Sequence, residues 1–202
     1  MADIIVLPGI GGSGDAHWQS LWQHDNPRMT RFSPENWDHP RLADWIGALD
    51  IAVAGSERPP LLVAHSLSCL LVAQWQRVSS LPVAGAFLVA VPDPSGAAFP
   101  SEASDFAPTP LEKFRFPSLI IASADDPYGT VGYVRRTAAA WGSGIVEIGA
   151  AGHINGASGL AEWPRGRDLL AAFAAGLEFP GNIASERRVF TDKPCSRCFD
   201  GD

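Results

Sequence analysis

The stretch that decides the fold runs from residue 61 to residue 70 and reads Leu61-Leu62-Val63-Ala64-His65-Ser66-Leu67-Ser68-Cys69-Leu70. Its first four residues form an unbroken apolar run after two prolines, which is typical of a strand buried on both faces. The residues after Ser66 have the pattern of a buried helix. The stretch therefore predicts a buried strand that turns directly into a buried helix, with His65 and Ser66 at the turn.

Further short apolar runs lie on both sides of this stretch and alternate with helical patterns. The runs are Ile4–Leu7, residues 86–91, Ser118–Ala122 and residues 144–148, with a weaker candidate at residues 29–32. The helical patterns cover residues 42–49, 66–78, 133–141 and 167–177. This alternation predicts the α/β class, with a mostly parallel sheet flanked by helices on both faces.

The composition indicates one folded domain followed by a tail. The chain has 202 residues, of which 46% are hydrophobic and 18% charged, so it can bury a core. The apolar periodicity stops near residue 180. We therefore expect a domain over residues 1–180 and a mobile C-terminal tail over residues 181–202.

The net charge of the chain argues against some classes of binding partner. Lys and Arg number 15 against 22 Asp and Glu, which gives a net charge of −7. Nucleic acids and anionic membrane surfaces bind basic faces. No apolar run approaches the roughly 18 residues of a membrane span, and the N-terminus lacks the basic segment of a signal peptide. We expect a cytoplasmic protein with a small-molecule partner and no nucleic-acid or membrane partner, and we leave its oligomeric state open.

Ser66 stands where a nucleophile elbow would place a reactive serine. Such a turn lifts the hydroxyl above the carboxyl edge of the sheet, and close packing there usually requires the pattern G-x-S-x-G. Ala64 and Ser68 occupy the two glycine places, and both are small. The alternative interpretation is that Ser66 only caps the helix that follows.

A serine nucleophile needs a base that an acid orients, and in this fold the chain order is Ser, acid, His. Asp125 and Asp126 directly follow the strand Ser118–Ala122, and His153 follows the next apolar run. All three should lie at the same sheet edge as Ser66. We favour Asp126 as the acid, with Asp125 as the alternative and Asp93 as a third candidate.

The first apolar run opens into a glycine-rich loop. Backbone N–H groups there can approach a ligand, so we expect the N–H groups of Ile10 and Leu67 to bind an oxyanion. The spacing Gly9-x-Gly11-x-x-Gly14 also fits a dinucleotide loop. Pro8 and Asp15 at its ends argue against nucleotide binding, because an acid would lie where the pyrophosphate belongs.

Other residues have two possible interpretations. His17 and Trp18 are candidates to line the pocket, although Trp18 fits the core better. Residues 92–117 are rich in proline, and such a long connection is typical of a lid or binding loop. Cys195 and Cys198 have the spacing of a metal pair, but no third ligand is nearby, so we expect no metal site.

Several motifs occur together in one order, and together they resemble a known family. They are Pro8-Gly9-Ile10-Gly11-Gly12, His17-Trp18-Gln19, Trp22, Ala64-His65-Ser66-Leu67-Ser68, Asp125-Asp126-Pro127 and Gly152-His153. From residue 3 to about residue 178 the chain resembles the small serine hydrolases of the retinoblastoma-binding-protein-9 type, within the α/β-hydrolase superfamily. The resemblance implies a compact α/β-hydrolase fold without a large cap domain. It implies Ser66 as nucleophile, Asp126 as acid and His153 as base.

The expected activity is hydrolysis of small ester or related acyl substrates through a Ser-His-Asp triad and an acyl-enzyme. This esterase-like chemistry requires no metal or organic cofactor. The alternative is a non-catalytic protein that keeps the α/β-hydrolase fold and acts in partner binding.

Overall fold

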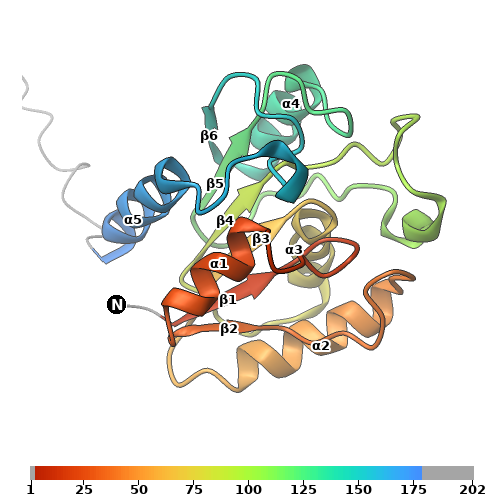
Figure 1. The fold of residues 1–202 in the computed structure, drawn as a ribbon. Helices are drawn as coiled ribbons and strands as arrows, with labels where there is room; N and C mark the ends of the chain where they lie inside the picture. Colours follow the sequence, from red (N-terminus) through yellow and green to blue (C-terminus); the bar gives the residue numbers. More distant parts are fainter. Residues whose placement is uncertain (1–2, 179–202) are drawn as a thin grey trace, which may run out of the picture.

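The computed structural model describes residues 3–178 of the chain, and its centre is one sheet of six parallel strands (Figure 1). The strand order across the sheet is β2-β1-β3-β4-β5-β6. The strands are β1 (Ile4–Leu7), β2 (Met29–Arg31), β3 (Leu61–His65), β4 (Gly85–Val89), β5 (Ser118–Ala122) and β6 (Gly144–Glu147). All six lie within one or two residues of the predicted runs, including the weak candidate that became β2.

Five helices cover the two faces of the sheet. They are α1 (Trp18–Asp25), α2 (Leu42–Ala54), α3 (Leu67–Val78), α4 (Val131–Trp141) and α5 (Pro164–Glu178). Alternate residues of β3 show the division: Leu62 packs in a cluster with α2, α3 and α4, whereas Leu61 and Val63 pack with α1 and α5. Because successive strand residues point to opposite faces, an unbroken apolar strand needs helices on both sides. The predicted α/β architecture is confirmed.

The proline-rich segment at residues 92–117 packs onto the body around a 3-10 helix, η1 (Ser101–Phe106). Phe106 is fully buried in the cluster that includes α2 and α3. Phe99 packs against the same cluster and also lines the cavity described below. A second 3-10 helix, η2 (Gly156–Ser158), lies in the loop before α5.

Among residues 3–178, no helix is both long and apolar enough to cross a lipid bilayer. The predicted C-terminal tail lies outside the described residues, as do Cys195 and Cys198, so those predictions stay predictions.

Candidate active site

The turn between β3 and α3 holds Ser66 in a conformation that non-glycine residues rarely adopt. Its backbone has φ 56° and ψ −124°. Such a conformation costs on the order of 1–3 kcal/mol and is characteristic of functional turns. Ser66 precedes the first residue of α3, but its side chain makes no capping hydrogen bond. The helix-cap interpretation is therefore wrong for the Ser66 side chain.

Gly9 is the residue that packs closely against this turn. A Cβ at Gly9 would lie 2.9 Å from the Cβ of Ser66. Ala64 is fully buried beneath the turn, and the Ser68 hydroxyl donates a hydrogen bond to the Pro8 carbonyl at 2.5 Å. The small residues at the two usual glycine places thus fit, and Ser68 ties α3 to the loop after β1.

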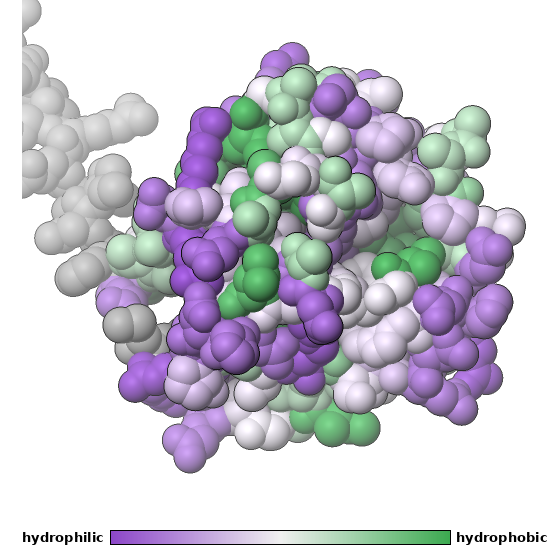
Figure 2. Space-filling model, viewed as in Figure 1, coloured by the Kyte–Doolittle hydropathy of each residue, from purple (hydrophilic) through white to green (hydrophobic). Residues whose placement is uncertain are grey.

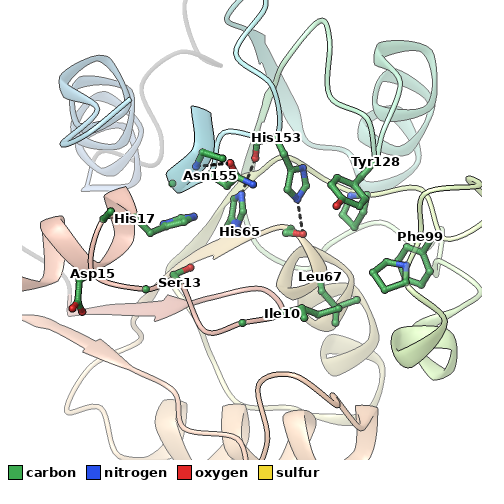
Figure 3. Close-up of a pocket in the computed structure, with 18 residues that line it drawn as sticks. Ile10, Ser13, Asp15, His17, His65, Leu67, Phe99, Tyr128, His153 and Asn155 are labelled. Carbon is green, nitrogen blue, oxygen red and sulfur yellow. Dashed lines mark hydrogen bonds between the residues drawn. The ribbon is translucent and has the colours of Figure 1, made fainter. Parts of the chain in front are cut away.

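Three side chains from separate loops form a continuous hydrogen-bonded row. The Nε2 atom of His153 lies 2.8 Å from the Ser66 hydroxyl oxygen (Figure 3). On the other side of the ring, Nδ1 lies 2.9 and 3.0 Å from the two carboxylate oxygens of Asp126. The side chains of His153 and Asp126 are almost entirely buried. The structure thus brings together the three residues predicted as base, nucleophile and acid.

Asp125, the alternative candidate for the acid, has different contacts from Asp126. Its Oδ1 accepts hydrogen bonds from the N–H groups of Ala151 and Gly152, each at 2.8 Å, and from the Ser123 hydroxyl. These bonds stabilise the carboxylate and lower the pKa of Asp125. Asp125 therefore holds the loop that leads into His153. The third candidate, Asp93, accepts hydrogen bonds from Ser95.

Two residues beside Ser66 have backbone N–H groups without a partner among the described residues. Ile10 and Leu67 both line the cavity there, and within residues 3–178 neither N–H has a hydrogen-bond partner. Free donors at such a position are able to bind an oxyanion.

Polar side chains, one half-buried and one buried, hold the loop after β1 in place. The Arg31 guanidinium donates to the Gly12 carbonyl at 2.6 Å. The Gln19 amide donates to the carbonyls of Leu7 and Val63, and its oxygen accepts from the Ser13 hydroxyl. The sequence analysis named Gln19 only as part of the family motif and assigned it no contact, because the sequence does not show which carbonyls a buried amide will meet.

Two further histidine rings pack behind His153. The centroid of His65 lies 5.0 Å from that of His153, and the centroid of His17 lies 4.7 Å from that of His65. The Nε2 of His65 lies 2.9 Å from the His153 carbonyl oxygen. Burial, together with Arg31 and His153, lowers the pKa of His17 to about 4. Burial also lowers the pKa of His65 well below its ordinary value, so both rings are neutral at neutral pH.

The low pKa of His17 predicts acid destabilisation. An unfolded chain binds this proton near pH 6.5, whereas the folded protein binds it near pH 4. The free energy of unfolding should therefore fall as the pH drops from 7 to 4, by about 3 kcal/mol from His17 alone. Urea unfolding at several pH values should show a smaller fall for His17→Asn than for the wild type. Identical pH dependence in both proteins would contradict the prediction.

Ser66 and His153 line a cavity of about 540 Å³ at the carboxyl edge of the sheet. Figure 2 shows hydrophobic residues at a hollow beside the loop after β1. His17 lines this cavity as predicted, but Trp18 does not. The Trp18 ring is buried between the sheet and α5, and its indole N–H donates to the Ile154 carbonyl at 2.8 Å. The prediction that Trp18 lines the pocket is wrong, because α1 directs the Trp18 side chain toward the core.

Solved structures of other proteins resemble this fold. The chain is 28% identical to a protein described as a YdeN-like hydrolase from Pectobacterium atrosepticum, with a TM-score of 0.78 over 86% of this chain and 91% of that one. It is 19% identical to the ydeN gene product of B. subtilis, with a TM-score of 0.70 over 87% and 100% of the two chains. An esterase domain from Rhodothermus marinus is 16% identical, with a TM-score of 0.62 over 89% and 88%.

These likenesses confirm the predicted α/β-hydrolase fold. No curated protein sequence matches the chain significantly. A family model described as serine hydrolase matches residues 4–172. The chain therefore belongs to the serine hydrolase family.

Proposed function

We propose that this hydrolase cleaves small esters or related acyl compounds, with Ser66 as nucleophile, His153 as general base and Asp126 as the acid that orients it. The observation that carries the proposal is the unbroken row from Asp126 through His153 to the Ser66 hydroxyl. A serine hydroxyl is a weak nucleophile, and a row of this kind is how proteins activate it.

In the first half of the reaction Ser66 Oγ attacks the carbonyl carbon while His153 Nε2 takes the hydroxyl proton. Asp126 accepts the hydrogen bond from Nδ1–H, which leaves Nε2 free to act as the base, and its charge stabilises the imidazolium. The N–H groups of Ile10 and Leu67 stabilise the negative oxygen of the tetrahedral intermediate. That intermediate collapses when the leaving alcohol receives the proton from His153, and the acyl group stays on Ser66.

In the second half a water molecule gives its proton to His153 and attacks the acyl-enzyme. The second tetrahedral intermediate releases the carboxylic acid, and Ser66 Oγ regains the proton. The Ser66 proton leaves with the alcohol and a proton from the water replaces it, so Ser66 and His153 end the cycle as they began it, and no step uses a metal or an organic cofactor.

The form of the cavity supports small substrates. Its volume of about 540 Å³ suits a molecule of modest size. Over residues 3–178 the segment that borders the cavity packs onto the body and builds no separate cap domain. The resemblance to hydrolases of the retinoblastoma-binding-protein-9 type agrees with a small, open site of this kind.

A panel of p-nitrophenyl esters with acyl chains from two to sixteen carbons tests the substrate class. We expect kcat/KM to be greatest among the short chains and to fall at least tenfold by twelve carbons, because longer chains exceed the cavity. Ser66→Ala serves as the control for hydrolysis outside the site. A steady rise in kcat/KM up to sixteen carbons would contradict the proposed preference.

A further inference from the structure

The two ends of the cavity differ in chemistry. On one side of His153 the wall is mainly apolar and aromatic and carries Leu67, Phe99 and Tyr128 (Figure 3). On the other side it is polar and includes His17 and Asn155. A ligand that fills this cavity should therefore have one apolar part and one part that can form hydrogen bonds.

The polar end contains a buried donor that has no acceptor. His17 Nδ1 accepts a hydrogen bond from the Gln19 N–H at 3.1 Å, so in the neutral ring the hydrogen is on Nε2. Nε2 is buried, and no atom of residues 3–178 accepts a hydrogen bond from it. Only 6% of the surface of His17 is exposed. An unpaired buried donor of this kind destabilises the protein unless a ligand or water pairs with it.

The neighbouring polar groups form hydrogen bonds with other atoms and not with His17 Nε2. The Ser13 hydroxyl donates to Gln19, and Asn155 Oδ1 accepts from the N–H of Ala157. His65 Nε2 pairs with the His153 carbonyl. Figure 3 shows the His17 ring directed toward His65 and Asn155 at this end of the cavity. Within residues 3–178 no acceptor pairs with this donor, so a bound ligand or a water molecule can supply one.

We infer that the Nε2–H of His17 binds an uncharged oxygen of the substrate, which makes the preferred substrates esters that carry an additional hydroxyl group. This inference rests on the proposed function. The low pKa keeps His17 neutral, and the Asp15 carboxylate on the same wall disfavours an anion. Neighbouring atoms cover Nε2, so binding of the oxygen requires a local side-chain shift of the kind that is common at binding surfaces.

Matched pairs of esters test this inference. The first pair is p-nitrophenyl butyrate against p-nitrophenyl 3-hydroxybutyrate, which places the hydroxyl on the acyl side. The second pair is propyl butyrate against 2,3-dihydroxypropyl butyrate, which places it on the alcohol side. In at least one pair we expect the wild type to favour the hydroxylated ester about tenfold in kcat/KM, which corresponds to about 1.4 kcal/mol.

Two substitutions of His17 link this preference to the ring. His17→Asn keeps a side chain that can cap α1 and removes the distant donor, whereas His17→Phe keeps the ring shape and removes both nitrogens. In each variant the ratio of the two kcat/KM values should fall to about one. Since the plain ester is the internal reference, a general loss of activity does not change this ratio. If His17→Phe does not fold, the ratio measured for His17→Asn alone tests the inference.

The failures of the two proposals are distinguishable. If the wild type hydrolyses both members of each pair equally well, a bound water satisfies Nε2 and this inference is overturned while the proposed function stands. If the wild type prefers the hydroxylated ester and both variants keep that preference, His17 is not its cause and this inference is overturned. If the wild type hydrolyses none of the esters, the proposed function itself fails.

Discussion

Replacing Asp126 by asparagine is expected to lower kcat about 10⁴-fold with little change in KM. The carboxylate fixes His153 with Nδ1 protonated, and an amide in its place favours the opposite tautomer and leaves the imidazolium unstabilised. Both carboxylate oxygens lie within 3.0 Å of Nδ1, so the substitution replaces one of two acceptors with an NH2 donor and removes the negative charge beside the ring. Steady-state kinetics on a short p-nitrophenyl ester measures the loss.

Asp125→Asn is the matched control for this experiment. Its remaining amide oxygen can still accept hydrogen bonds from the N–H groups of Ala151 and Gly152, although without the charge. We expect a fall in kcat of tenfold or less, through a looser loop before His153. If the two variants lost equal activity, or Asp125→Asn lost more, the assignment of Asp126 as the acid would be wrong.

Replacing Gly9 by alanine is expected to lower kcat by about 10²- to 10³-fold, the range that follows the loss of one oxyanion donor. The new Cβ would lie 2.9 Å from the Ser66 Cβ, a distance that real Cβ atoms essentially never show. Either the loop that carries the Ile10 N–H or the turn that carries Ser66 has to move. Thermal unfolding should show that the variant remains folded.

Gly14→Ala is the control, because it changes the same loop at a point where an added Cβ meets nothing within 4 Å. We expect a change in kcat of threefold or less. Equal activity of the Gly9→Ala variant and the wild type would show that close approach of this loop to Ser66 is unimportant for the reaction.

Much of the fold was predictable because four of the six strands, β1, β3, β4 and β5, are short and almost entirely apolar. Strands β1 and β5 have the predicted bounds, and even β2, with only three residues, occurs where its weak pattern indicated. The helix ends were less predictable: α4 begins two residues before the predicted pattern, at Val131, because Thr130 caps it through a hydrogen bond to the Tyr133 N–H.

The site was predictable where chain order and strand ends determine it, and unpredictable where single side chains choose their partners. Ser66, Asp126 and His153 meet because parallel strands bring their carboxyl ends to one edge. No pattern indicated that Asp125 would turn toward the N–H groups of the His153 loop. Trp18 was ambiguous because an aromatic residue on a helix fits either the core or a pocket.

Labelling with a fluorophosphonate probe tests the central claim most directly, because the probe forms a covalent bond only with an activated serine. Mass spectrometry of the labelled wild type should place the adduct on Ser66, and Ser66→Ala should remain unlabelled at the same probe concentration. Failure of the wild type to label, or equal labelling of Ser66→Ala, would contradict the account.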